Sequence, residues 1–276
     1  MKSDAVIQLK HKGEMNNIFR YIILSLFLFS SCSLIKEMFP PSPENILQND
    51  NFNWVKDSSD NFYYYFETNS TASNKINKIK SFLESNYKDL LKLNGINFYQ
   101  PKIKFFMLES REKMELLFGY KTNGKAIPKY NATYSVIGKK TNALGMHEIC
   151  HVISNNVLGD WSESWINEGL AVYSDNDWHG YNLHQLSNYF FENDKIISFK
   201  ELFNNMGSYN SLISYPEAGS IVKYIYEKYG FDAIKILWKE GSVSMQKATG
   251  LKLEDLESQW KEEIKKFNTQ NVKYNI

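Results

Sequence analysis

The sequence has little net charge and few long apolar runs, and each shortage excludes a class of protein. Its 276 residues contain 32 Lys and Arg against 31 Asp and Glu, which leaves a formal net charge of +1. The basic residues are scattered, so we expect no positive field that would bind nucleic acid. The apolar run from Tyr21 to Phe29 is too short to cross a bilayer comfortably, because a spanning helix needs about 20 residues.

Histidine is also scarce, yet two of the five histidines lie four residues apart in His147-Glu148-Ile149-Cys150-His151. Residues i and i+4 share one face of an α-helix, so both imidazoles can bind one metal ion. Glu148 would then lie beside the metal and accept a proton from activated water. The alternative is a surface helix with two solvated histidines.

The residues around this motif favour the metal interpretation. They are mostly apolar and predict a buried helix, in which histidine and glutamate side chains need partners. We expect the helix to begin at Ala143, with Asn142 or Thr141 as its cap, and to end at Gly159. Cys150 is expected to fill space in the packing of this helix, as free cysteines commonly do.

A four-coordinate zinc site needs a third protein ligand and leaves one position for water. Glu168 is the candidate, since it lies in the helical segment Trp165 to Ala171, seventeen positions after His151. That gap fits one loop, Gly159 to Ser162, and the first turn of a second helix. The alternative is an ordinary glutamate in a first helical turn, favoured by the helix dipole.

Together these segments carry a family resemblance. H-E-x-x-H followed by W-x-N-E-G-L-A resembles the gluzincin metallopeptidases, in particular the small peptidase-MA-like domains. The resemblance implies that His147, His151 and Glu168 are zinc ligands and that Glu148 is the catalytic base. It covers roughly residues 104–230. No segment like G-x-M-E-N, which reads the substrate N-terminus in large aminopeptidases, is present, so the resemblance does not extend to aminopeptidase activity.

A further part of the resemblance concerns the donor that stabilises the negative oxygen formed during hydrolysis. The segment Tyr215-Pro216-Glu217-Ala218-Gly219-Ser220 is similar to a tyrosine-led helix that lines the site in these domains, which implies this role for Tyr215. Pro216 suits a first helical position. The alternatives for the donor are Tyr209, His179 and His184.

The sequence leaves two further features of the site undecided. An acceptor should orient each ligating imidazole, and Asn167 and Asp175 are both candidates. The segment Tyr130–Ile137 alternates like a strand, and we expect either an ordinary sheet strand or an edge strand that binds an extended peptide.

The N-terminal segment predicts a lipid anchor. Met15 to Arg20 is short and positive, the apolar run follows, and Ser30-Ser31-Cys32 resembles a bacterial lipobox. The resemblance implies cleavage before Cys32 and lipid on its sulfur, which would leave Cys150 without a disulfide partner. We expect Met15 to be the true start. The alternative is a single transmembrane anchor.

These observations predict an α+β, zincin-like fold in which the active-site helix lies between an N-terminal α/β lobe with a small sheet and a helical lobe. We expect a signal peptide over residues 1–31, a lipid-anchored linker over 32–51, the α/β lobe over 52–142 and the helical lobe over 143–276. The predicted strands include Phe62–Phe66 and Lys102–Leu108, and the predicted helices outside the motif are Ala72–Leu93, Arg111–Phe118, Leu183–Glu192, Phe199–Asn204, Glu217–Tyr229, Phe231–Glu240 and Leu253–Phe267.

The sequence therefore predicts a zinc metallopeptidase that hydrolyses peptide bonds through zinc-bound water activated by Glu148. Its partners would be a peptide or protein substrate and a membrane, reached through the lipid anchor in the cell envelope. The alternatives are an inactive peptidase-like lipoprotein used for binding and a zinc hydrolase of a non-peptide substrate. A membrane-embedded protease is disfavoured by the short apolar run.

Overall fold

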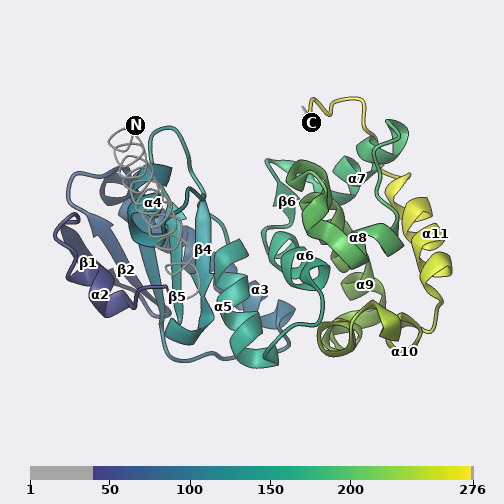
Figure 1. Cartoon of the computed structure of the whole chain (residues 1–276), viewed down its shortest axis with the longest axis horizontal. Coiled ribbons are helices and arrows are strands. Elements are labelled where there is room, and N and C mark those ends of the chain that lie inside the picture. The colour runs from purple at the N-terminus through teal and green to yellow at the C-terminus, as the bar shows by residue number, and fades with distance from the viewer. Residues whose placement is uncertain (1–39, 275–276) are drawn as a thin grey trace, which may run out of the picture.

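The computed structural model describes residues 40–274 of the chain. An α/β lobe with a five-stranded sheet is followed by a helical lobe, and helix α5 (His147–Leu158) lies between them (Figure 1). The expected mixed α/β architecture is therefore confirmed. Within residues 40–274, no helix combines the length and the apolar character needed to cross a membrane.

The sheet consists of β1 (Trp54–Ser58), β2 (Phe62–Glu67), β3 (Ile103–Leu108), β4 (Gly124–Ile127) and β5 (Ala132–Val136). Its order is β1-β2-β3-β5-β4, with β2, β3 and β5 parallel and the two outer strands antiparallel to their neighbours. Helix α3 (Thr71–Leu93) connects the parallel pair β2 and β3, as such a pair requires. The predicted strand at Tyr130–Ile137 is β5, and it lies inside the sheet, so its assignment as an edge strand is wrong.

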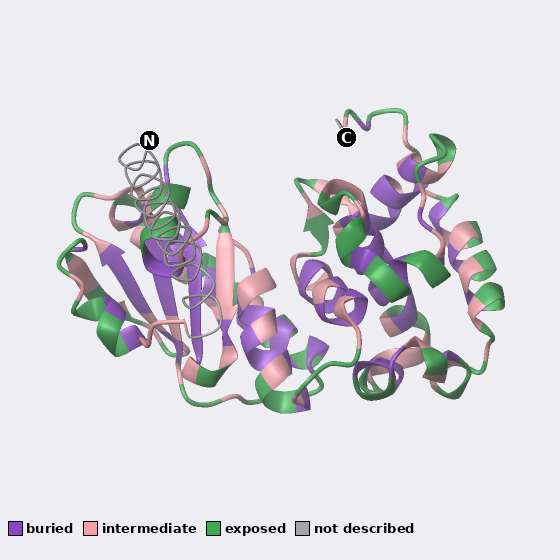
Figure 2. Cartoon of the chain, viewed as in Figure 1, coloured by how far each residue is buried: buried purple, intermediate pink, exposed green. Residues whose placement is uncertain are grey.

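Both faces of the sheet are covered, and this explains its apolar strands. Phe62 and Tyr64 belong to the core that includes α3 and α5, whereas Tyr65 packs with α4 (Arg111–Phe118) on the other face. Side chains that alternate along a strand therefore enter two different cores. Figure 2 shows the inner strands as buried and β4 as intermediate. Strand β4 thus ends the sheet next to α5 and is less buried than the strands inside the sheet.

The helical lobe is built on the contact between α6 (Ser164–Asp175) and α9 (Ser211–Glu240). Gly169 and Gly219 allow this close approach. A Cβ at Gly169 would lie 2.6 Å from Val222, and a Cβ at Gly219 would lie 2.5 Å from Val172. The other helices are α7 (Leu183–Glu192), α8 (Phe199–Asn205), α10 (Met245–Thr249) and α11 (Leu253–Ile264).

Several boundaries differ from those expected. The motif helix begins at His147 and not at Ala143, because residues before it turn back to the sheet through Ala143 N–Val136 O and the Ile137–Asn142 bridge. By contrast, the predicted break at Gly230 is confirmed, since α9 consists of two helical segments that meet at a kink where Gly230 adopts a non-helical φ of 79°. A short hairpin of β6 (Asp177–Trp178) and β7 (Tyr181–Asn182) was not predicted.

The predicted linker, residues 32–51, is partly folded in the described chain. Residues Pro43–Leu47 form helix α2, Ile46 is buried, and its carbonyl accepts a hydrogen bond from the Trp54 indole at 3.0 Å. The proposed signal peptide, the start at Met15 and the lipidation site at Cys32 lie outside the described residues.

Candidate metal centre

Helix α5 has one face in the core and one at an open cleft. Ile149, Val152 and Ile153 are fully buried, while the two histidines of the motif face the cleft. The expected caps Asn142 and Thr141 do not cap this helix, which begins four residues later than predicted.

Asp175 takes over this capping role from a distance. Met146 precedes α5 and has no side-chain cap of its own, and its backbone N–H donates to Asp175 Oδ1 at 2.5 Å. Asp175 is the last residue of α6, so this bond joins the end of one site helix to the start of the other. A carboxylate at a helix N-terminus also stabilises the helix dipole.

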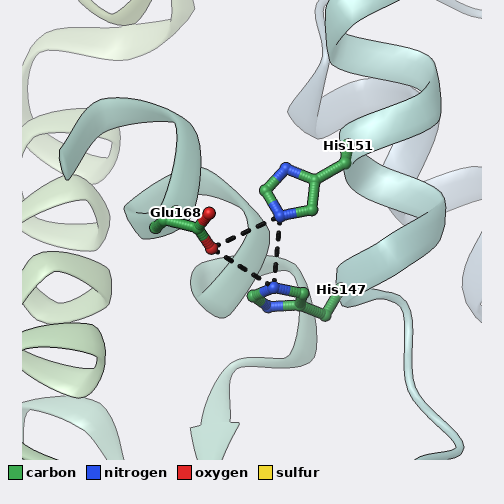
Figure 3. A group of neighbouring side chains, drawn as sticks. All are labelled: His147, His151 and Glu168. Atoms are coloured by element: carbon green, nitrogen blue, oxygen red, sulfur yellow. Dashed lines mark hydrogen bonds and ion pairs between the residues drawn. The ribbon is translucent and has the colours of Figure 1, made fainter. Parts of the chain in front are cut away.

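His147, His151 and Glu168 converge from α5 and α6 (Figure 3). The Nε2 atoms of the two histidines lie 3.2 Å apart, and Glu168 Oε2 lies 3.5 Å from His147 Nε2 and 3.4 Å from His151 Nε2. Two imidazole nitrogens and one carboxylate oxygen form a donor set that suits a zinc-like cation. The cluster is therefore able to hold a metal ion.

The electrostatics agree with a cation at this point. Burial lowers the pKa of His147, but the hydrogen bond to Glu168 and the charge of Glu148 outweigh it and raise this pKa to about 9. Burial raises the pKa of Glu168, yet the two histidines keep it below its ordinary value. The Glu168 carboxylate thus stays negative and favours positive charge, on a proton or a bound cation, at the imidazoles beside it.

Asn167 orients one of the imidazoles. Its Oδ1 lies 3.1 Å from His151 Nδ1 and also accepts a hydrogen bond from Asn155 Nδ2 at 3.3 Å. An amide oxygen can only accept, so His151 Nδ1 carries the proton and Nε2 is left free to bind a metal. Of the two expected acceptors, Asn167 contacts an imidazole, whereas Asp175 caps α5.

Glu148 lies in a 1330 Å³ cleft lined by α5, α6, β4 and the β6–β7 hairpin. Burial raises the pKa of Glu148, and the charges of His147 and His151 offset this only in part. A carboxylate with a raised pKa beside a set of candidate metal ligands is suited to accepting and releasing a proton. Gly124 of β4 lies directly against this carboxylate.

Tyr215 lies in the same cleft, on the first turns of α9. The helix begins at Ser211, so the expectation that Pro216 occupies its first position is wrong. Burial, together with the charges of Glu168 and Glu148, raises the pKa of Tyr215 to about 12, so its hydroxyl keeps its proton. Its hydroxyl has no hydrogen-bond partner among residues 40–274 and is available to a ligand.

The other candidate donors are placed less favourably. His184 is 2% exposed and its Nδ1 pairs with Ser220 Oγ at 2.8 Å, so burial lowers its pKa to about 4 and it serves packing. Tyr209 packs against the core and does not line the cleft. His179 does line the cleft, on the hairpin, with its ring beside Trp178.

Cys150 is fully buried and its thiol lies 3.7 Å from the Leu170 carbonyl. Burial raises the pKa of this thiol to about 12, which agrees with its expected packing role. Sequence reasoning missed Gly124 and Trp178 as cleft residues. The segment around Gly124 is short and lacks the alternation typical of a strand, so its sequence does not place Gly124 in the cleft. Trp178 follows the end of a helix, and no motif or periodicity around it indicates a role.

Comparison with known proteins gives one match. A family model described as Peptidase MA superfamily matches residues 86–266, from within α3 to just beyond α11. This span contains the whole cluster of His147, His151 and Glu168, and also Glu148 and Tyr215. Neither the search of curated proteins nor that of solved structures found a match.

Proposed function

The chain belongs to the peptidase MA superfamily, and from this we propose that it is a zinc-dependent peptidase of the gluzincin type. The observation that carries the proposal is the convergence of His147, His151 and Glu168, from two helices, beside the half-buried Glu148. Bound zinc would supply Lewis acidity, which at such sites activates water and polarises a carbonyl.

Each residue around this point has a task that its surroundings support. The Glu148 carboxylate accepts a proton from the attacking water and delivers it to the leaving amine. The Tyr215 hydroxyl donates a hydrogen bond to the oxygen that becomes negative in the transition state. Asn167 holds the His151 ring by accepting from Nδ1, so that Nε2 keeps its direction.

The unpaired edge of the sheet, at β4, supports a peptide as the substrate. The outer side of β4 pairs with no other strand in the described chain and borders the cleft beside α5. An extended peptide can add to such an edge through backbone hydrogen bonds, which places its scissile bond near Glu148. Peptide binding at a sheet edge, which the sequence suggested for Tyr130–Ile137, is therefore proposed for β4.

We also propose that the protein is a lipoprotein of the cell envelope, anchored through Cys32. The support is the lipobox-like sequence Ser30-Ser31-Cys32 after a short apolar run. Because α2 is packed against the α/β lobe, the tether between anchor and domain would end before Pro43. This position would bring the cleft to substrates near the membrane.

The experiment that tests peptidase function is proteomic identification of cleavage sites. Wild-type protein from Ser33 onward is incubated with a proteome-derived peptide library, beside Glu148→Gln as the matched control. We expect new termini with wild type and none with the variant. Equal patterns would reject the peptidase and favour a binding protein or a hydrolase of another substrate, which a panel of ester and amide probes would separate.

A further inference from the structure

The C-terminal segment of the described chain lies against the wall of the cleft. Val272 packs with Leu186 and Phe190 of α7, and Tyr274 packs with the β6–β7 hairpin. Tyr181 of β7 holds this segment through two bonds: its hydroxyl donates to Lys273 O at 3.0 Å and accepts from Lys273 N at 3.3 Å. In Figure 1 the yellow segment that precedes residue 275 lies near α7, above the hairpin.

The Tyr274 hydroxyl connects two elements of this wall. It accepts a hydrogen bond from the Trp178 indole at 2.8 Å and donates one to the Leu212 carbonyl at 3.0 Å. Trp178 ends β6, and Leu212 is the second residue of α9. One hydroxyl therefore ties the hairpin to the first turn of the helix that carries Tyr215.

The bond to Leu212 replaces one that the helix cannot make. In α9 the Leu212 carbonyl would accept from the backbone N–H of residue 216, but that residue is Pro216, which has none. A backbone carbonyl without a partner in a partly buried place destabilises its turn. Tyr274 supplies the missing donor from the far end of the chain.

The wall held in this way surrounds Tyr215. Trp178, Leu212 and Tyr215 all line the cleft, and the rings of Trp178 and Tyr215 lie 5.8 Å apart with an interplanar angle of 36°. Tyr215 makes no hydrogen bond to a described residue that would fix its ring. Its direction therefore depends on packing: on the main core, on the Trp178 ring and on the turn of α9 beneath it.

We propose that Tyr274 is a positioning residue for the cleft: its hydroxyl holds Trp178 and the first turn of α9 so that the Tyr215 hydroxyl points at the reacting group. The catalytic consequence rests on the proposed peptidase function, whereas the positioning itself does not. Phenylalanine at position 274 would keep the ring packing and remove both hydrogen bonds.

Nuclear magnetic resonance tests the positioning without any substrate. In the zinc-loaded chain from Ser33 onward, the Trp178 indole N–H and the Tyr215 ring signals are assigned with Trp178→Phe and Tyr215→Phe. We expect Tyr274→Phe to shift both signals and speed exchange of the Trp178 indole proton, with the other five of the six tryptophans unchanged. Unchanged Trp178 and Tyr215 signals would overturn the proposal.

The matched control is Tyr189→Phe. Tyr189 also contacts this segment, through its hydroxyl and Tyr274 O at 3.5 Å, but its hydroxyl is hydrogen-bonded to neither Trp178 nor Leu212. We expect it to leave both signals in place. If Tyr189→Phe moves them as far as Tyr274→Phe does, the segment acts through general packing and the specific role of the Tyr274 hydroxyl is rejected.

Kinetics test the consequence with a double-mutant cycle on dye-labelled casein. We expect Tyr274→Phe to lower kcat about fivefold, the factor that loss of one ordinary hydrogen bond corresponds to, with KM little changed. In a Tyr215→Phe background the same change should have almost no effect, because it acts through Tyr215. Additive effects would overturn the proposal. If wild type cleaves neither casein nor the peptide library, the peptidase function fails and the magnetic resonance result alone decides the positioning.

Discussion

Gly124 and Glu148 lie in direct contact across the cleft, and the contact requires that residue 124 have no side chain. A Cβ at this position would overlap Glu148 Oε1 and lie 2.8 Å from both Glu148 Cδ and Cγ. Gly124 opens β4, and Glu148 is in the first turn of α5. The edge strand therefore sets how far the carboxylate of the proposed base can turn.

The first prediction follows from this contact. Gly124→Ala should displace the Glu148 carboxylate and lower turnover by about 10²-fold, since misplacing a reacting group by about 1 Å has an effect of that order. Bound zinc should be unchanged, because the three atoms nearest to a Cβ at this position all belong to Glu148, which is not a proposed ligand. Gly207→Ala is the matched control, since a Cβ there meets nothing within 4 Å. Equal turnover in the two variants would show that Gly124 does not position the Glu148 carboxylate.

The second prediction concerns the metal ligands. The wild-type domain should hold one zinc per chain by elemental mass spectrometry. His147→Ala, His151→Ala and Glu168→Ala should each lose it, because two protein ligands rarely hold zinc tightly. Glu148→Gln should keep both metal and fold. Wild type without zinc after reconstitution would reject the assignment.

Glu163 provides the control for Glu168 in this experiment. Its carboxylate accepts from the Trp165 indole at 2.6 Å and from Ser242 N at 2.9 Å, so it joins α6 to the turn after α9. Glu163→Ala should therefore lower the Tm and still bind zinc, since it removes buried hydrogen bonds but no ligand. Equal loss of zinc in both variants would mean that Glu168 is not the third ligand.

The third prediction tests the orientation of His151. Asn167→Ala removes the acceptor at His151 Nδ1 and should weaken zinc binding about 10–100-fold, measured by competition with a chelator. Asn167→Asp, which keeps the acceptor, should restore most of the affinity. Asn156→Ala, at an exposed site on α5, the helix that carries His151, should leave zinc affinity unchanged. An unchanged Kd in Asn167→Ala would show that the ring is held by other contacts.

The fourth prediction concerns stability and pH. Glu217 is fully buried, accepts from Ile197 N at 3.1 Å, and burial raises its pKa well above the usual 4.5. The folded protein therefore binds this proton more tightly than the unfolded chain does. The free energy of unfolding should fall as pH rises from about 4.5 toward the folded value.

Glu217→Gln tests this, because it keeps an amide oxygen for Ile197 and cannot ionise. Urea unfolding at pH 5 and pH 8 should show a smaller difference in the variant than in wild type, with the variant the more stable at pH 8. Glu254→Gln, at an exposed site on α11, should follow wild type. A variant whose pH dependence matches wild type would contradict the assignment.

The fifth prediction concerns the anchor. Cells that express the full gene should yield a membrane-bound form that begins at Cys32 and carries a palmitate analogue. Cys32→Ala should abolish the label and leave the precursor uncleaved. Detection of an intact N-terminus at Met15 or Met1 by mass spectrometry would indicate a transmembrane anchor instead.

Local patterns in the sequence were sufficient to predict features whose residues all lie within one helix. His147 and His151 lie four residues apart, and helical periodicity alone places both on one face. The helix Arg111–Phe118 was predicted with its observed bounds, because Gly119 ends it in a left-handed conformation with φ 85°. These features depend on neighbours within one or two turns.

The tertiary structure decided everything that joins distant segments. The sequence placed Glu168 at a workable spacing, but only the packing of α6 on α5 brings its carboxylate to 3.4 Å from His151. It left Asn167 and Asp175 as equal candidates, because which side chain meets the ring depends on how the two helices face each other. Strand β4 was not predicted, since its few residues have no alternation and its pairing with β5 supplies their order.

The bond between Tyr274 and Leu212 is a clear example, since it spans 62 residues. Proline 216 shows in the sequence that a carbonyl in α9 lacks its usual donor. Nothing in the sequence says which side chain replaces that donor. Short-range periodicity determines which residues share a face, whereas contacts between faces arise only when the whole core has packed.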